Sequence, residues 1–385
     1  MNKKLMAVAV AGALVAPAAA LAQSTVTVYG KFTAEYGYVD QGAGRPNTDM
    51  LQTPGGSAVG FKGEEKLGGG LSAWFQCESS ADVRGVGQDG FCSRNSALGI
   101  KGSFGNLHFG RWDTPFKRST VGMIGAGDTG LLGAAFLFAG NSTGTGATGG
   151  IAPQSLSRNV WKRRESSQIY YESPSFNGFQ ILTAYSAANA TSSVDASTAA
   201  KPRVTSLAGT YANGPIAIGL GYERHTAFGN VGGSNDDKAW TIGGTYTFAG
   251  KVKVGAQYID ARYETNAVQD LTKKNWMLGL EWNIQGPHNF DAAYVKAGDS
   301  KGSATTNPGL GGGNGPVLVP GIGNTGAKMF QLGYRHEFSK RTSVKFAYVK
   351  LDNDTAATYS LGGLAAPTIA GESQSAWVMY ASHSF

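Results

Sequence analysis

Hydrophobic and polar positions alternate with a period of two along most of the chain beyond residue 23. In the segment 26–39 (VTVYGKFTAEYGYV), Val26, Val28 and Phe32 fall on one face, and Lys31 and Glu35 fall on the other. The same alternation recurs over residues 240–248, 252–258, 276–284, 330–334 and 375–385. Because successive strand side chains point to opposite faces, each segment predicts a strand with one apolar face and one polar face.

Short and long connections alternate between these segments along the chain. Short connections are expected at residues 65–70, 103–106, 173–178, 213–215, 249–250, 285–288 and 338–341. Long ones are expected at residues 40–56, 79–92, 113–160, 188–202, 225–237, 264–272, 298–327 and 352–372. This alternation is typical of an up-and-down barrel with its turns at one end and its loops at the other. A two-sheet sandwich offers no reason for it.

The number of strands decides which face points inward. About sixteen strands enclose a lumen too wide for side chains to fill, so the polar faces should line water and the apolar faces should contact lipid. Closure also removes the unpaired strand edges that hydrocarbon does not tolerate. We therefore predict an all-β fold, a transmembrane antiparallel β-barrel of about 16 strands. Tyr36, Trp240 and Trp276, near strand ends, predict the aromatic girdles at the membrane surfaces.

The first 22 residues have the pattern of a cleavable signal peptide. Lys3 and Lys4 precede an apolar stretch over residues 5–16, and Ala20-Leu21-Ala22 matches an A-x-A cleavage site. A retained N-terminal anchor is the alternative. The predicted mature chain, residues 23–385, is then a single barrel domain that is exported to the cell outer membrane.

Composition and charge are consistent with a barrel and argue against nucleic-acid binding. Charged residues make up 15% of the chain, against about 25% in an average soluble domain. Removing the two signal-peptide lysines leaves 31 Lys and Arg against 26 Asp and Glu, a net charge of +5. That excess predicts a mild preference for anions. No basic run is interleaved with aromatic residues, so no nucleic-acid partner is expected.

Cys77 and Cys92 flank a polar, glycine-containing segment. In an exported protein this arrangement favours a disulfide, with free thiols as the alternative. No histidine lies near them in sequence to complete a zinc site, so no metal is expected there. The five histidines are scattered at positions 108, 225, 288, 336 and 383, with no nucleophile motif beside them. We therefore expect neither a cofactor nor an enzyme activity.

Four motifs and the last residue, Phe385, can be compared with known families. The motifs are residues 26–31 (VTVYGK), 61–75 (FKGEEKLGGGLSAWF), 98–115 (LGIKGSFGNLHFGRWDTP) and 169–179 (IYYESPSFNGF). Together they resemble the general Gram-negative porin family, particularly its β-proteobacterial branch. The resemblance implies a sixteen-stranded homotrimer whose third long loop, residues 113–161, folds into the lumen as a constriction. It also implies outer-membrane lipid and lipopolysaccharide as partners, and Phe385 as the assembly signal for the barrel-assembly machinery. This loop departs from the family because Asp113 and Asp128 are its only carboxylates.

Alternation also predicts which charges face the lumen. The inward cationic candidates are Lys31, Lys62, Lys101, Arg164, Lys253, Arg335 and Lys345. Arg111, which matches the family's Gly-Arg position, and Arg164 are expected beside the constriction. A second hypothesis places Arg158, Lys162 and Arg163 on the surface, where they would bind lipopolysaccharide phosphates.

The function expected from these features is a water-filled channel for passive diffusion of ions and small hydrophilic solutes, with a weak anion preference. Three alternatives stay open. A substrate-specific outer-membrane channel would be blocked by its solute. A plugged structural or adhesive barrel would not conduct. A soluble secreted β-protein would need no detergent.

Overall fold

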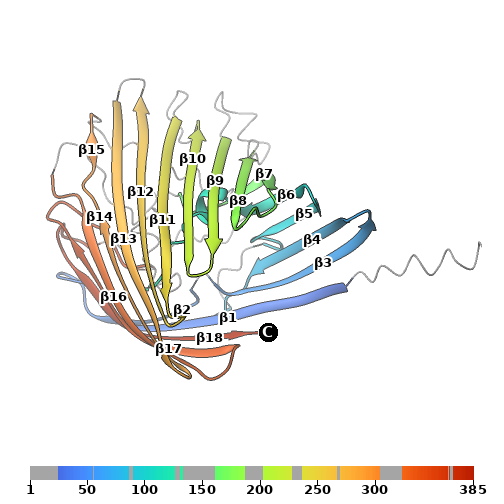
Figure 1. Cartoon of the computed structure of the whole chain (residues 1–385). Coiled ribbons are helices and arrows are strands. Elements are labelled where there is room, and N and C mark those ends of the chain that lie inside the picture. Colours follow the sequence, from blue (N-terminus) through green and yellow to red (C-terminus); the bar gives the residue numbers. More distant parts are fainter. Residues whose placement is uncertain are drawn as a thin grey trace, which may run out of the picture.

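Antiparallel strands follow one another along the whole described chain (Figure 1). The computed structural model describes residues 25–54, 56–85, 90–125, 131–132, 161–186, 203–227, 236–266, 269–303, 323–362, 364 and 367–385. The strands are β1 (Thr25–Asp40), β2 (Thr48–Gln52), β3 (Ala58–Gly68), β4 (Leu71–Ser80), β5 (Ser96–Gly102), β6 (Gly105–Asp113), β7 (Arg164–Glu172), β8 (Phe179–Ser186), β9 (Arg203–Asn213), β10 (Ile216–Thr226), β11 (Asp236–Phe248), β12 (Val252–Asn266), β13 (Gln269–Gln285), β14 (His288–Ala297), β15 (Lys301–Gly302), β16 (Ala327–Glu337), β17 (Thr342–Asn353) and β18 (Gln374–Ser384). One helical turn, α2 (Pro115–Arg118), follows β6. No helix in these ranges is long and apolar enough to span a membrane.

The sheet closes because the first strand pairs with the last. β1 pairs with β18 from Lys31↔Ser384 to Asp40↔Ser375. Along its other edge β1 pairs first with β3 and then with the short β2, so β2 and β3 together act as one interrupted strand. The two-residue β15 only extends the ladder beside β13. Sixteen strands therefore form the closed barrel, which confirms the predicted fold.

The last residue takes part in this seam. The Phe385 backbone N–H donates to the Gly30 carbonyl at 3.0 Å, and the Gly30 N–H donates to the Phe385 carbonyl at 3.2 Å. The Phe385 ring lies 5.7 Å from the ring of Phe32, centroid to centroid. The terminal aromatic residue thus continues the β1–β18 ladder.

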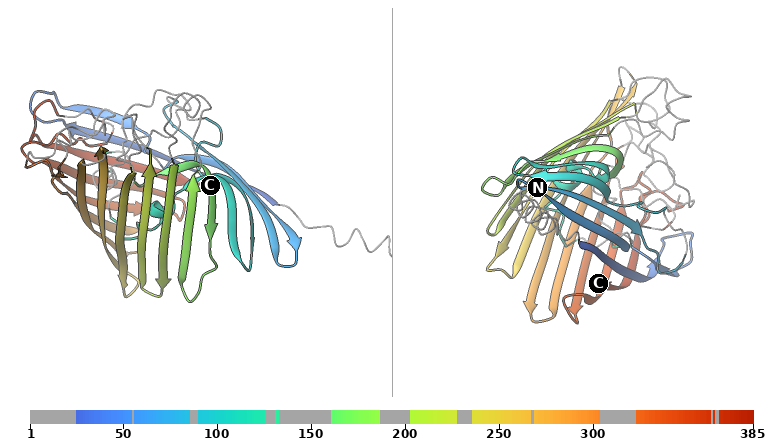
Figure 2. Two further views of the ribbon diagram at one scale, coloured as in Figure 1. Left: turned by 90° about the horizontal axis from the view of Figure 1, so that it is seen from above. Right: turned by 90° about the vertical axis from the view of Figure 1, so that its right-hand side faces the viewer.

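Short turns gather at one end of the barrel, called the turn end here, and long connections at the other, the loop end (Figure 2). In the β3–β4 turn, Gly68, Gly69 and Gly70 all have positive φ, of 86°, 58° and 79°. These are conformations that side chains disfavour, so the glycine run specifies this turn.

One predicted long loop, residues 264–272, is wrong. β12 continues to Asn266 and β13 begins at Gln269, so only two residues separate the strands. The reason lies in the outward side chains of this hairpin. Arg262 pairs with Asp270 at 2.7 Å and Lys274 with Asp260 at 3.2 Å. Charged residues on the outer face remove the alternation that marks strands elsewhere.

The outer face is apolar, as predicted. Val28, Leu220 and Trp377 are each more than half exposed there. The inner face is polar toward the turn end, as expected. Toward the loop end it is not polar, so the prediction of a polar inner wall along the whole barrel is wrong there. There, on β12 to β18, the inward side chains are apolar and buried: Ile259, Met277, Val295, Met329, Val349, Leu351 and Val378.

Chain segments inside the barrel cover this apolar inner wall. Leu131, Leu132 and Trp161, from the long connection after β6, belong to the same buried cluster. Tyr359, Leu361 and Leu364, from the connection between β17 and β18, pack into it as well. Water is thereby excluded from these inward residues, so apolar side chains are favoured where a wet wall would need polar ones.

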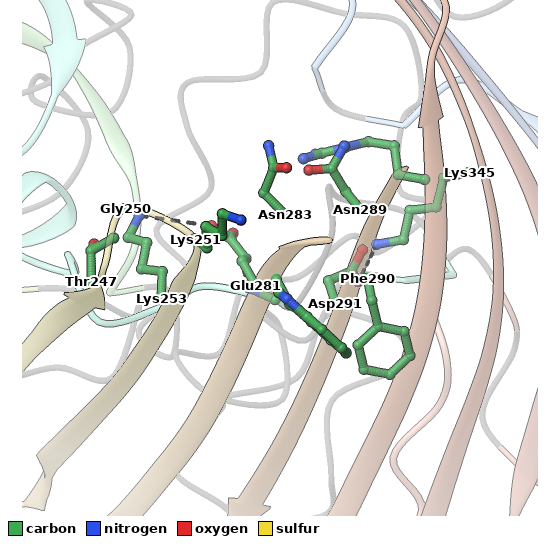
Figure 3. Close-up of a pocket in the computed structure, with 13 residues that line it drawn as sticks. Thr247, Gly250, Lys251, Lys253, Glu281, Asn283, Asn289, Phe290, Asp291 and Lys345 are labelled. Carbon is green, nitrogen blue, oxygen red and sulfur yellow. Dashed lines mark hydrogen bonds and ion pairs between the residues drawn. The ribbon is translucent and has the colours of Figure 1, made fainter. Parts of the chain in front are cut away.

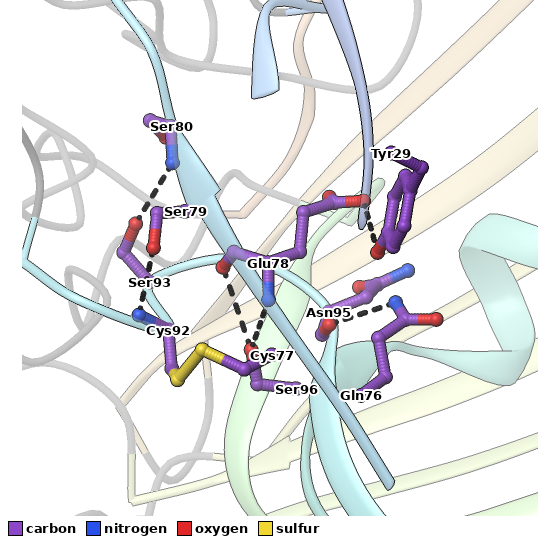
Figure 4. Close-up of a disulfide and its surroundings, with 10 residues drawn as sticks. All are labelled: Tyr29, Gln76, Cys77, Glu78, Ser79, Ser80, Cys92, Ser93, Asn95 and Ser96. Carbon is purple, nitrogen blue, oxygen red and sulfur yellow. Dashed lines mark hydrogen bonds between the residues drawn. A yellow bond between two sulfur atoms is a disulfide. The ribbon is translucent and has the colours of Figure 1, made fainter. Parts of the chain in front are cut away.

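A disulfide fastens the loop end near β4 (Figure 4). Cys77, on β4, is bonded to Cys92, with a Cα–Cα distance of 4.8 Å. Two serine hydroxyls support the connection, since the Cys92 N–H donates to Ser79 Oγ at 2.9 Å and the Ser80 N–H donates to Ser93 Oγ at 3.2 Å. Residues 77–92 are therefore held to the rim at both ends.

The same connection contains a locally stabilised carboxylate, Asp82. Hydrogen bonds from the Arg84 side chain, with a further one from Thr53, lower the pKa of Asp82 to about 2. A depressed pKa means that the ionised form is favoured by folding. The stabilisation is full above the ordinary carboxyl range and is lost as the pH falls toward 2.

The disulfide gives a test of this rim. Replacing both cysteines by alanine should cost about 3 kcal/mol, because the bond closes a segment of 15 residues. Urea unfolding of the barrel in lipid vesicles measures this loss. Wild type with and without reductant is the matched control. Free thiols in the untreated folded protein, or equal stability in both states, would contradict the disulfide.

Candidate functional site: the charged lumen

The long connection after β6 turns inward at once. Thr114 caps α2, with its Oγ1 accepting from the Lys117 N–H at 3.4 Å, and Pro115 suits the first helical position. The Phe116 N–H donates to Ser206 Oγ on β9 at 3.0 Å, and the Phe116 ring is buried. This short helix therefore lies against the inner wall at β8 to β10.

Beyond α2 the chain runs along the inner wall. The Gly122 N–H donates to Gln257 on β12 at 2.9 Å, and the Gly125 N–H donates to Glu281 on β13 at 3.3 Å. Gln331 on β16 donates to the Gly125 carbonyl at 3.0 Å. Further on, the Leu131 N–H donates to Glu35 on β1 at 2.7 Å. We call residues 114–125 the wall segment.

Glycines on the wall allow this close approach. A Cβ at Gly279 would lie 2.0 Å from the Ile124 carbonyl oxygen, and one at Gly219 would lie 2.0 Å from the Ser119 carbonyl oxygen. Real side chains do not come so close, so any other residue would push the wall segment away from the barrel.

The far end of the same connection is anchored by a buried aromatic and ionic group. The Trp161 ring stacks on His225, with centroids 4.1 Å apart, and its Nε1 donates to the Tyr263 hydroxyl at 2.8 Å. Arg163 is buried in an ion pair with Glu165 at 2.7 Å. The hypothesis that Arg163 binds lipopolysaccharide at the surface is therefore wrong. Lys162 is half-buried, and Arg158 lies outside the described residues.

A first group of charges surrounds α2. Asp113 accepts from Lys117 at 2.7 Å and lies 3.2 Å from Arg164. Arg118 pairs with Glu172 on β7. The structure thus brings the predicted Asp113 and Arg164 together. Arg111 stands opposite Ser96 and donates to Ser166 at 3.5 Å.

A second group of charges forms the basic pocket, toward the turn end of β11 to β17 (Figure 3). Its lining includes three predicted residues, Lys253, Arg335 and Lys345. The full lining is Gly125, Thr247, Gly250, Lys251, Lys253, Glu281, Trp282, Asn283, Asn289, Phe290, Asp291, Arg335 and Lys345. Four cations against two carboxylates leave a formal charge of +2. Gly125 places the wall segment at the edge of this pocket.

The cations of the basic pocket differ in how fully they are neutralised. Lys345 pairs closely with Asp291, at 2.6 Å, and both are nearly buried. Lys253 is 3.8 Å from Glu281, and Arg335 is 3.3 Å from Glu337, all four being partly exposed. Arg335 and Lys345 stand directly opposite each other on neighbouring strands. Like charges so placed repel, and the carboxylates Asp291 and Glu337 offset part of this repulsion.

The remaining predicted cations lie on the opposite strands. Lys101 pairs with Glu64 at 2.6 Å, and the Lys62 ammonium lies 5.2 Å from the centre of the Tyr29 ring. Lys31 faces inward at the β1–β18 seam. Asp128 lies outside the described residues. Lys251 was not among the predicted inward cations, although the alternation places it on the same polar face as Lys253.

A closed sixteen-stranded barrel with an apolar outer face and a charged inner wall defines a channel protein of the outer membrane. Residues 7–356 match the Gram-negative porin family, and the chain belongs to that family. This confirms the resemblance of its motifs. The barrel is an outer-membrane porin, with its turn end toward the periplasm and its loop end outside the cell.

Individual relatives agree over nearly the whole length. The chain is 29% identical to outer membrane porin protein 32 of Delftia acidovorans, with 100% of both chains covered. It is 27% identical to an outer membrane porin of Bordetella pertussis, with 90% of this chain and 93% of the relative covered. Among solved structures, the anion-selective porin from Comamonas acidovorans has a TM-score of 0.72 at 24% identity, covering 94% of this chain and 100% of that one. OmpT of Vibrio cholerae has a TM-score of 0.64 at 16% identity, with coverages of 94% and 98%. These two likenesses concern the fold.

The glycine contacts predict how the wall segment responds to mutation. Gly279→Ala should push Ile124 from the wall, so single channels should show more frequent spontaneous closures and greater open-channel noise. Planar-bilayer recording measures both. Gly209→Ala is the matched control, because its Cβ would meet the Phe179 ring at an ordinary 3.4 Å. Equal closure frequencies in Gly279→Ala and wild type would contradict the close approach.

Proposed function

We propose that this porin favours small anions among the ions and hydrophilic solutes that diffuse through it, and that the basic pocket carries this preference. The supporting observation is the +2 charge of a lumen wall whose Lys253 and Arg335 are only loosely paired. The Comamonas relative of similar fold is itself described as anion-selective.

The proposed mechanism needs no binding step. A hydrated anion entering the lumen is attracted by the positive potential of the basic pocket. The low-dielectric protein around the water path keeps this potential concentrated in the lumen. We propose that the connection 113–161 narrows this path, with the wall segment as the part fixed to the barrel. The α2 charges, where Asp113 lies between Lys117 and Arg164, line the same passage.

Selectivity can be tested by removing the loosely paired cations. At about 8 Å through water, a unit charge changes an ion's energy by roughly 0.5 kcal/mol. Lys253→Gln with Arg335→Gln removes two such charges, which costs an anion about 1 kcal/mol and favours a cation by about 1 kcal/mol, so the anion-to-cation permeability ratio should fall by up to about thirtyfold before salt screening. The reversal potential in a salt gradient measures the ratio. Lys274→Gln, on the outer face of β13, is the matched control. A cation-selective wild type, or an unchanged ratio in the double variant, would contradict the proposal.

A solute-specific channel is the second candidate. Asn283 and Asn289 stand beside the cations of the basic pocket, and amide groups there could hold a particular solute. Such a solute would block the ion current in a concentration-dependent manner. In a general diffusion pore, no single solute would block the current in this way. A plugged barrel would show no current steps at all. We propose no catalytic role.

We further propose a homotrimer, held by the apolar groove on the outer face of β1 and β16 to β18. Tyr36, Tyr38, Phe346, Trp377 and Met379 line this groove. One solved structure of OmpT from Vibrio cholerae, with a TM-score of 0.63, is described as a trimer form.

The trimer proposal predicts a position-dependent effect of charge. Trp377→Arg should dissociate the assembly, because the guanidinium would be buried at the subunit contact without a partner. Tyr222→Arg, an exposed aromatic position on β10, should leave the trimer intact. Native mass spectrometry in detergent gives the mass of the assembly. A monomeric wild type, or trimers in both variants, would contradict this interface.

Lipopolysaccharide and the assembly machinery complete the proposed partners. Arg224, Lys238 and Arg262 stand opposite one another on β10 to β12, on the outer face toward the loop end. Each also pairs with a carboxylate, namely Asp236, Glu264 and Asp270 in turn. We propose these partly exposed cations, in place of Arg163, as the lipopolysaccharide contact. Phe385, in the closing seam, remains the proposed assembly signal.

A further inference from the structure

We infer that Gln331, a side chain buried in the inner wall, is a positioning residue that sets how strongly the basic pocket favours anions. Gln331 is on β16 and only 1% exposed, so it does not itself meet the water path. Its amide joins the wall segment to the carboxylate that neutralises Lys345. The inference rests on the proposed function, because it concerns the charge of the same pocket.

The amide of Gln331 makes two hydrogen bonds with one of its ends. Its Nε2 donates to the Gly125 carbonyl of the wall segment at 3.0 Å and to Asp291 Oδ1 at 3.1 Å. An amide NH₂ group has two hydrogens, so both bonds can form at once. Both neighbours are acceptors, and therefore only the NH₂ end of the amide suits them. Gln331 thus links the position of Gly125 to that of Asp291.

Asp291 extends this link to a cation of the basic pocket. The same Oδ1 accepts from Lys345 Nζ at 2.6 Å (Figure 3). The ion pair lies over Gly333, where a Cβ would be 2.5 Å from Lys345 Cε and 2.8 Å from Asp291 Oδ1. A larger residue at position 333 would displace the pair. Asp291 is therefore held from two sides, by Lys345 and by Gln331.

The other backbone group of Gly125 reaches a second cation. The Gly125 N–H donates to Glu281 Oε1 at 3.3 Å, and Glu281 Oε2 is 3.8 Å from Lys253 Nζ. Gly125 has a φ of 67°, and a Cβ there would lie 2.2 Å from the Ala292 carbonyl oxygen on β14. Both backbone groups of Gly125 are thus bonded to side chains that contact the charges of the basic pocket.

These contacts determine how much of the Asp291 charge acts on an ion in the lumen. An N–H that donates to a carboxylate is a charge-assisted hydrogen bond, and the positive end of its dipole offsets part of the negative charge. Without the Gln331 donor, Asp291 would keep Lys345 but lose this second donor. The basic pocket would then be less positive, although no charged residue had been changed.

The experiment measures the anion-to-cation permeability ratio of Gln331→Leu, from the reversal potential of single channels in a salt gradient. Leucine is similar in size and donates no hydrogen bond. The ratio should fall about twofold, less than the roughly fivefold expected when a whole unit charge is removed at about 8 Å through water. Gln331→Met, which keeps the length of the side chain, should give the same fall and takes the place of Gln331→Leu if that variant forms no channels.

Gln257→Leu is the matched control. Gln257 is also a buried glutamine that holds the wall segment, since its Oε1 accepts from the Gly122 N–H at 2.9 Å and its Nε2 donates to Thr241 Oγ1 at 2.8 Å. Neither of these partners is charged. Both variants should therefore loosen the wall segment and raise the frequency of closures, but only Gln331→Leu should change the permeability ratio.

A double variant separates this inference from the proposed anion preference. With Asp291→Asn already present, Gln331→Leu should leave the ratio unchanged, because no carboxylate remains for the amide to offset. An unchanged ratio in Gln331→Leu, an equal fall in Gln257→Leu, or a fall that persists with Asp291→Asn would overturn the role of Gln331. A cation-selective wild type would contradict the proposed function alone, since a fall that Asp291→Asn abolishes would still support the role of Gln331.

Discussion

Pairing between the first and last strands is the constraint on which the rest of this porin depends. Each strand crosses a region where a backbone N–H or C=O without a partner costs several kcal/mol, and water is not there to replace it. The β1–β18 ladder, continued by Phe385 and Gly30, gives hydrogen-bond partners to the backbone groups along the two strand edges that would otherwise stay open. Once the barrel is closed, the outer face must be apolar, and the inner face is free to serve both the pore and the covering segments.

The inner wall divides its surface between two tasks. Toward the turn end it holds exposed charges, including Lys253 and Arg335 of the basic pocket. Toward the loop end, Met277 and Val349 pack against internal chain and hold it in place by burial. A third part of the inner wall consists of glycines, and the wall segment packs directly on their backbone. Wall charge and wall contacts are thus determined by different residues of the same strands.

Alternation was sufficient to predict the barrel, the strand number and the inward direction of Lys253, Arg335 and Lys345. Once the apolar face of a strand is known to point outward, every second side chain must point into the lumen. It failed at residues 264–272, where ion pairs such as Arg262–Asp270 make the outer face polar. It could not predict the contacts of Arg163 or the neighbours of Arg111, because these depend on how a connection folds back in space. Alternation likewise could not predict that Lys251 and Arg335 line the same pocket, because this depends on the curvature of the barrel.

The seam also dictates the timing of assembly. Lys31 and Ser384 pair across 353 positions of sequence (384 minus 31), so this contact joins the first strand to the last. Such a contact is slow to form, because almost the entire chain must be ordered before it is made. A chain that enters the periplasm N-terminus first cannot close until its last strand has arrived. During that interval β1 carries an open edge, and a chain truncated before β18 would keep it permanently, as a template for aggregation.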